Sequence, residues 1–347
     1  MGEQHRVTEA CDLLDERGHL VEPGYATAPL WRYDRAAIRA SRLRIKEWDY
    51  YAVLAPDAGH GLTVTVADLG FLGLVAVCWL DLERNTFAQA DRMRVMPLGQ
   101  MGLSSHSGDG RVEVDHGGLR LALETRGETR TITVDAPDFE GPGGQRGLRG
   151  SVDLHHAAAD DAMVIATSWA ENRRAFYYNH KVNAMPATGS FELGGETHEF
   201  DPANSFGTLD WGRGNWTYRN RWYWGSASGL VQGRRFGFNI GYGFSDRSVA
   251  SENMLFVDGR AHKLGEVIFD FDPDDVMRPW RFTSDDGRFE AEMAPRLDRN
   301  GKTDLGLLRS IQHQVFGDFT GEVVLDDGEI LRLDGLLGFA EDVLNWW

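Results

Sequence analysis

Cysteine and long apolar runs are both scarce in this sequence of 347 residues. Only Cys11 and Cys78 occur, without C-x-x-C spacing, which excludes a disulfide framework and a thiolate zinc site. The longest apolar run, residues 71–80, is about ten residues long, too short to span a bilayer. The first thirty residues hold no apolar run of signal-peptide length. We therefore expect a cytoplasmic protein with no integral membrane segment.

Basic residues are outnumbered by acidic ones, 36 to 53, which gives a formal net charge of −17. Such a surface repels nucleic acid and anionic membranes, so we expect neither as a partner. No G-x-S-x-G elbow, P-loop or G-x-G-x-x-G before a helix is present, so acyl-hydrolase, nucleotide and dinucleotide chemistry have no support. We expect no cofactor, and the oligomeric state stays open.

Helical periodicity is absent from every window of twelve or more residues after residue 46. Alternating segments such as 62–67, 119–124 and 129–134, together with 41 glycines, are typical of strands joined by tight turns. The pattern predicts an all-β chain of barrels or sandwiches. We expect a lead-in segment over 1–33 and two β domains over 34–190 and 191–347.

Local signals refine this outline. Asp34 is placed to cap a short helix, and Gly-rich pairs at 194–195, 258–259 and 327–328 predict hairpins. The segment 137–150, rich in Gly and Pro, is predicted to be a loop.

What the sequence has in abundance is aromatic residues, concentrated over 204–257. Four of its eleven tryptophans lie between Trp211 and Trp224, interleaved with charged residues. Buried charge is costly unless it is paired or used. The strand-like segment 236–244 has large apolar residues at even positions and only Gly or Asn239 at odd ones, so one of its faces is nearly bare. We interpret the run as one wall of a cavity, with Asn239 on the bare face; the alternative is that it serves packing alone.

A set of motifs spread along the chain suggests a family. In order, they read FYYNHK from Phe176, LDWGRG from Leu209, WYWGSASG from Trp222, FNIGYG from Phe238, SEN from Ser251, PWRF from Pro279, HQVFG from His313 and GFAED from Gly338. Together they resemble the bacterial and fungal family called domain of unknown function 2804, from about residue 22 to the end of the chain.

More distantly, the hairpin followed by D-W-G-R-G and a W-x-W strand resembles a group of tandem lipocalin-like proteins. That group includes carotenoid hydratases of the hydroxyneurosporene synthase type, tocopherol cyclase and fungal Diels-Alder cyclases. The resemblance implies two lipocalin-like halves with a ligand cavity at or near their interface. It also implies proton transfer or substrate folding without a redox cofactor.

Four residues are candidates for acid/base catalysis. A carboxylic acid or imidazolium in a dry pocket can protonate an alkene or open a ring, and aromatic faces stabilise a developing cation. The candidates are Asp210, Glu252, His180 and His313. The structural alternatives are an ion pair between Asp210 and Arg213, and a strand-end role for His180.

Further polar and aromatic residues of the same motifs are candidates for substrate binding. They are Tyr178, Asn179, Trp211, Arg213, Trp222, Trp224, Asn239, Asn253 and Gln314. The predicted function is a cofactor-independent isomerase, cyclase or hydratase acting on a small apolar or amphipathic metabolite, such as a terpenoid or polyketide.

Several alternatives use the same residues. One alternative function is that of a non-catalytic carrier of a lipophilic ligand. A second is that of a glycoside-active enzyme with Asp210 and Glu252 as its carboxylate pair. A metal shell of His180, Asp210, Glu252 and His313 lacks any H-x-H or H-E-x-x-H spacing, so we expect no metal. The closing segment with Glu341 and Asp342 either reaches the cavity or plugs a barrel end.

Overall fold

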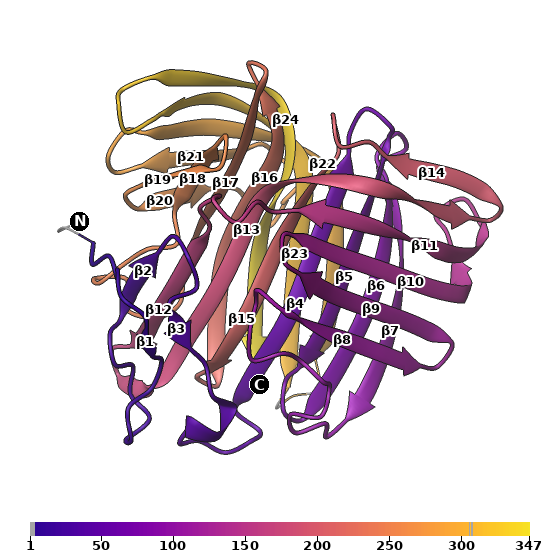
Figure 1. Ribbon diagram of the computed structural model, residues 1–347. Helices are drawn as coiled ribbons and strands as arrows, with labels where there is room; N and C mark the ends of the chain where they lie inside the picture. Colours follow the sequence, from indigo (N-terminus) through magenta and orange to yellow (C-terminus); the bar gives the residue numbers. More distant parts are fainter. Residues whose placement is uncertain (1–3, 305, 307) are drawn as a thin grey trace.

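The computed structural model describes residues 4–304, 306 and 308–347. Within these residues the chain forms two large antiparallel sheets and no α-helix (Figure 1). Asp34 caps a single 3-10 turn, η1 (Arg35–Ala37), by accepting a hydrogen bond from the Ala36 N–H at 2.8 Å. No helix in the described part of the chain has the length and apolar character needed to cross a membrane. The predicted all-β class is confirmed.

The first sheet joins thirteen strands of the described chain. Its main path runs in the order β7-β6-β5-β4-β15-β13-β11-β10-β9-β8, with β12, β2 and β14 attached through β13. The strands are β2 (Gly24–Ala26), β4 (Ile45–Ala55), β5 (His60–Asp68), β6 (Leu72–Asp81), β7 (Thr86–Val95), β8 (Gly110–His116), β9 (Leu119–Arg126), β10 (Thr129–Glu140), β11 (Arg146–His155), β12 (Met163–Trp169), β13 (Asn172–Leu193), β14 (Glu196–Phe200) and β15 (Phe206–Asn215).

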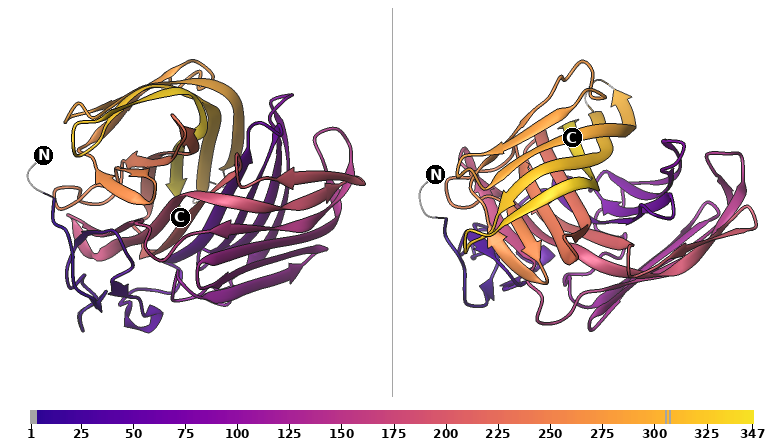
Figure 2. Two further views of the ribbon diagram at one scale, coloured as in Figure 1. Left: turned by 45° about the horizontal axis from the view of Figure 1, so that its top comes forward. Right: turned by 90° about the horizontal axis from the view of Figure 1, so that it is seen from above.

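The second sheet joins nine described strands in the order β19-β18-β17-β16-β24-β23-β22-β21-β20. They are β16 (Arg219–Val231), β17 (Arg234–Tyr242), β18 (Met254–Val257), β19 (Arg260–Lys263), β20 (Val267–Asp270), β21 (Trp280–Ser284), β22 (Phe289–Asp304), β23 (Arg309–Val324) and β24 (Ile330–Trp346). A small parallel pair, β1 (Cys11–Asp12) with β3 (Trp31–Arg32), lies near the N-terminus. Both large sheets curve strongly, so that two barrel-like halves stand side by side (Figure 2).

The chain passes from one sheet to the other between β15 and β16. Strands β14 and β15, which the predicted boundary at residues 190 and 191 assigns to the second half, hydrogen bond to β13 of the first sheet. The lead-in segment also contributes, because β2 pairs with β12. The long strand β13 therefore holds the first sheet together and also contacts β16 and β17 of the second.

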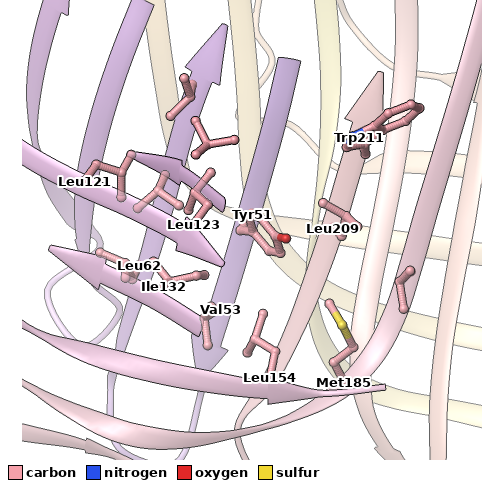
Figure 3. Packing of buried hydrophobic residues seen from close by; sticks show 14 of the residues in the cluster. Tyr51, Val53, Leu62, Leu121, Leu123, Ile132, Leu154, Met185, Leu209 and Trp211 are labelled. Carbon is pink, nitrogen blue, oxygen red and sulfur yellow. The ribbon is translucent and has the colours of Figure 1, made fainter. Parts of the chain in front are cut away.

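The first core lies on the inner side of the first sheet. Strand β4 shows the alternation that builds it: Tyr51 and Val53 enter this core, whereas Tyr50 and Leu54 belong to a separate cluster between the two sheets. Both faces of β4 are therefore buried. Figure 3 shows Trp211 among the residues of the first core.

The predicted hairpins are confirmed at Gly194, between β13 and β14, at Asp258, between β18 and β19, and at Asp327, between β23 and β24. The predicted loop 137–150 is wrong except for residues 141–145, because β10 and β11 continue on either side. A Cβ atom at Gly150 would lie 2.2 Å from the carbonyl oxygen of Ser190. That glycine permits close approach of β13 and does not mark a loop.

Candidate active site

A cavity of about 240 Å³ lies between the two sheets. Its lining comes from β4, β5, β6, β7, β13 and β15 on one side and from β16, β22, β23 and β24 on the other. Residues that follow strand ends, such as Trp216, Phe244 and Trp347, complete the wall. The predicted cavity at the interface of the two halves is therefore present.

One part of the cavity is a cluster of five aromatic side chains, which we call the aromatic cage: Trp48, Tyr177, Trp216, Trp222 and Phe244. The Trp216 ring lies 5.7 Å from those of Trp48 and Trp222 and 5.6 Å from that of Tyr177, centroid to centroid. The contacts are mostly edge to face, the arrangement that aromatic quadrupoles prefer. A ligand in the aromatic cage would therefore contact mainly aromatic rings.

Gly212 explains why the D-W-G-R-G motif needs its first glycine. It lies opposite Trp48 in the pairing of β15 with β4, and a Cβ atom there would be 2.1 Å from the Trp48 ring. The indole can lie across the strand only because that side chain is missing. In this position the Trp48 Nε1–H donates to Asp210 Oδ1 at 3.1 Å.

A buried charge cluster, made of Lys181, Asp210 and Glu252, borders the cage. The Lys181 Nζ lies 3.3 Å from Asp210 Oδ2 and 3.9 Å from Glu252 Oε2, and 3.6 Å from the centre of the Trp224 ring. Asp210 Oδ1 also accepts from Asn179 Nδ2 at 2.6 Å. One ammonium group thus bridges two carboxylates, an arrangement that satisfies charges which burial would otherwise make costly.

Tyr177 extends this cluster into the cage. Its hydroxyl donates to Glu252 Oε2 at 3.0 Å. Burial raises the pKa of Glu252 above its usual value, although the attraction of Lys181 acts in the opposite direction. Burial also raises the pKa of the Tyr177 phenol, so it remains a hydrogen-bond donor at neutral pH.

Glu341 on β24 is a second carboxyl group in the same cavity. Its Oε1 accepts from Gln314 Nε2 at 2.8 Å and its Oε2 accepts from Trp222 Nε1 at 3.2 Å. Burial raises the pKa of Glu341 to about 7, against the lowering effects of the Trp222 hydrogen bond and the charge of Lys181. Both protonation states of this carboxyl are therefore accessible near neutral pH, as an acid/base catalyst requires.

The predicted residues that line this cavity are Asp210, Glu252, Trp222, Trp224, His313 and Gln314. Asn179 does not line the cavity itself but donates a hydrogen bond to Asp210, which does. The His313 Nδ1 lies 2.8 Å from Asp298 Oδ2.

A second group of predicted residues lies on the opposite face of the first sheet. His180, Tyr178, Trp211 and Arg213 point away from the cavity, because alternate residues of a strand face opposite sides. His180 Nδ1 bonds to Ser107 Oγ at 2.7 Å, and burial lowers its pKa well below the usual value.

The expected ion pair of Arg213 with Asp210 is replaced by another one. Arg213 Nη2 lies 2.9 Å from Asp49 Oδ1 on β4, and the guanidinium stacks on Trp211 with 3.9 Å to the ring centre. Residues 210 and 213 differ by an odd number of positions, so their side chains cannot share a face of β15.

The bare face of β17 is filled by the protein itself. A Cβ atom at Gly237 would lie 2.9 Å from Asn183 Cβ of β13, and one at Gly241 would lie 1.9 Å from Glu252 Oε1. Asn239 does not line the cavity, which corrects its predicted place. It accepts from Trp224 Nε1 at 2.7 Å and so fixes the ring that packs against Lys181.

Asn253 and Asp342 also have structural partners. Asn253 Oδ1 accepts from the Gly241 N–H at 2.7 Å, while Asp342 pairs with Arg221 at 2.7 Å. Of the two acidic residues near the C-terminus, Glu341 reaches the cavity.

Sequence reasoning missed Lys181, Tyr177, Trp48 and Arg299. For the first two a signal exists: in a strand, Tyr177 and Lys181 share the face of Asn179. The other two lie on β4 and β22, and no local pattern connects them to the aromatic run.

Within residues 4–304, 306 and 308–347, no group of three or more His, Cys, Asp or Glu side chains is arranged to hold a metal ion. His180 and Asp210, two members of the alternative metal shell, lie on opposite faces of the first sheet.

Two curved antiparallel sheets with a cavity between them define a tandem β-barrel-like protein. Kievitone hydratase from Nectria haematococca has the same fold, with a TM-score of 0.50 and 11% identity over 86% of this chain and 88% of that one. CghA is similar with a TM-score of 0.54 and 13% identity over 96% and 97%. At such identities the likeness establishes the fold, and the predicted resemblance to tandem lipocalin-like proteins is confirmed at that level.

The chain belongs to the family described as domain of unknown function DUF2804, which matches residues 4–347. The family membership predicted from the motifs is therefore confirmed. A comparison with curated protein sequences gives no match.

Proposed function

We propose that the protein is a non-redox acid/base enzyme of the hydratase, cyclase or isomerase type. Its substrate is a small apolar or amphipathic metabolite, such as a terpenoid or polyketide, that occupies the cavity between the sheets. The observation that carries the proposal is the Glu341 carboxyl group, whose pKa of about 7 places its proton beside an aromatic cage.

In the proposed reaction the Glu341 carboxylic acid donates its proton to an unsaturated carbon of the substrate. The cation that forms faces the rings of Trp216 and Trp222, whose π electrons stabilise it. The cation then takes up a water molecule, closes a ring or loses a neighbouring proton. Addition of water and loss of a neighbouring proton each release one proton, and ring closure onto a double bond leaves a new cation that ends in one of the same two ways. The released proton returns to the Glu341 carboxylate.

The buried charge cluster supports this step electrostatically. Lys181 lies between the carboxyl groups of Asp210 and Glu252. When both are ionised, the cluster has one net negative charge and favours a positive charge in the neighbouring cage. Asp210 and Glu252 then stabilise charge, and Glu341 takes the acid/base role that the sequence assigns to them. His180 has no part in this proposal because its side chain lies in the first core.

The name of kievitone hydratase, which has a similar fold, is consistent with the proposed addition of water.

The geometry of the cavity argues against the glycosidase alternative. In that alternative, Asp210 and Glu252 would flank a sugar bond, with room for substrate or water between them. Here the Lys181 ammonium occupies that space, within 3.9 Å of both carboxylates.

The test is mass spectrometry of a small-molecule extract from the encoding organism after incubation with the protein. Wild type should convert a compound to a product of equal mass, or of a mass larger by one water molecule. The Glu341→Gln variant should not, whereas Glu322→Gln, which removes a surface carboxylate on β23, should behave as wild type.

Two outcomes would overturn the proposal. Conversion that persists in Glu341→Gln would remove Glu341 from the chemistry. A compound that co-purifies and is never converted would show a carrier and not an enzyme.

A further inference from the structure

Arg299 on β22 brings a second cation into the cavity wall. Its Nε donates to Gln89 Oε1 at 2.7 Å and its Nη1 donates to Gln314 Oε1 at 2.8 Å. Both acceptors are neutral amide oxygens. The guanidinium is thus held in a fixed orientation by partners that do not cancel its charge.

The two cations of the cavity, Lys181 and Arg299, differ in whether a carboxylate contacts them. Lys181 has Asp210 and Glu252 as carboxylate partners. Arg299 forms no direct ion pair with a carboxylate of residues 4–304, 306 and 308–347, and the carboxyl groups of Glu341 and Asp91 attract it only at longer range. Its neighbour Cys78 stays a neutral thiol, since burial raises its pKa to about 11. Burying a guanidinium that touches no carboxylate is costly, and an anionic ligand oxygen in direct contact with it would offset that cost.

We propose that Arg299 binds an acidic oxygen of the substrate, and that the substrate class is an apolar unsaturated compound with one carboxylate or acidic enol. This inference rests on the proposed function and specifies which compounds the cavity accepts. An acidic group is directed to Arg299 because the cluster around Lys181 already holds two carboxyl groups for one ammonium.

The order of groups along the wall fits such a substrate. Arg299 bonds to Gln314, Gln314 bonds to Glu341, and Glu341 bonds to Trp222, which belongs to the aromatic cage. An acidic oxygen at Arg299 therefore leaves the unsaturated carbons beside Glu341 and the apolar remainder in the cage. The side-chain amide of Gln314 thus connects Arg299, which would bind the acidic oxygen, to Glu341, which would donate the proton.

The test compares matched pairs of acidic and neutral probes by calorimetry and by quenching of tryptophan fluorescence. The first pair is 1-naphthaleneacetate with 1-naphthaleneethanol; the second is 4-hydroxycoumarin, an acidic enol, with coumarin. Wild type should bind the acidic member of at least one pair about 10- to 100-fold more tightly, the effect of a charge-assisted hydrogen bond. The pair that shows the preference identifies the acidic group as carboxylate or enol.

Variants then locate the preference. Arg299→Gln should bind acidic and neutral probes equally, and Arg299→Lys should keep part of the difference. Arg296→Gln, on the same strand but bonded to the carbonyl oxygen of Leu82 outside the cavity, should behave as wild type. The probe comparison in wild type needs no variant, so misfolding of Arg299→Gln leaves it intact.

The possible failures are distinguishable. Equal binding of acidic and neutral probes by wild type overturns the inference about Arg299 and leaves the proposed function standing. A preference that persists in Arg299→Gln also overturns it. Loss of conversion in Glu341→Gln with unchanged acid preference supports both proposals, whereas conversion by Glu341→Gln refutes the proposed function alone.

Discussion

Replacing Lys181 by methionine tests the buried charge cluster directly. The side chains of Lys181, Asp210 and Glu252 are 3%, 11% and 3% exposed, so the two carboxyl groups have little access to water. Methionine keeps an unbranched apolar side chain beside Trp224 but removes the ammonium. Because breaking a buried ion pair leaves an uncompensated charge, we expect the free energy of unfolding to fall by about 3–5 kcal/mol at neutral pH.

The loss should depend on pH in a defined direction. Lys181 lowers the pKa of Glu252 against the raising effect of burial, so its removal raises that pKa further. A carboxyl group whose pKa is higher in the folded than in the unfolded state loses stability as pH rises from the unfolded value through the folded one. The destabilisation of Lys181→Met should therefore be greater at about pH 8 than at about pH 5.

Urea denaturation followed by tryptophan fluorescence measures both quantities. The matched control is Lys302→Met, which removes an exposed lysine on β22 and should change stability by no more than about 0.5 kcal/mol. A loss below about 1 kcal/mol for Lys181→Met would mean that the three groups are solvated like a surface pair. Equal losses at both pH values would refute the coupling of Lys181 to the carboxyl groups.

Other substitutions test the positions of the two carboxyl groups. Gly212→Ala should displace Trp48 and lower the free energy of unfolding by about 1–3 kcal/mol. In the same urea denaturation assay Gly108→Ala should change it little, because nothing lies within 4 Å of the place of its added Cβ atom. Trp222→Phe keeps an aromatic ring but removes the donor to Glu341, so the pKa of Glu341 should rise and the pH profile of turnover should shift to higher pH. An unchanged profile would show that this hydrogen bond does not tune the acid.

Most of the fold could be predicted from the sequence because strand alternation and Gly turns are local signals. The turns at Gly194 and Asp258 needed only a few neighbouring residues. The sheet boundary could not be found in that way. Strand β15 looks like the start of the second half in sequence, but its hydrogen bonds go to β4 and β13.

The site was predicted less completely, for two physical reasons. Residue type alone does not separate the two faces of a strand, so it favours His180 over its neighbour Lys181, although only Lys181 faces the cavity. Contacts between neighbouring strands that are far apart in the sequence are the second reason. Arg213 pairs with Asp49, 164 positions away, and Glu341 accepts a hydrogen bond from Trp222, 119 positions away. Such partners depend on the pairing of strands, which no local pattern specifies.

The most direct measurement is a pH titration of the side-chain carboxyl carbons by ¹³C NMR, with glutamate labelled, in wild type and Glu341→Gln. The proposed mechanism predicts a resonance in wild type with an apparent pKa of about 7 that is missing from the spectrum of the variant. If every glutamate carboxyl titrated below about pH 5, near the ordinary value for this residue, Glu341 would be ionised at neutral pH and could not serve as the proton donor.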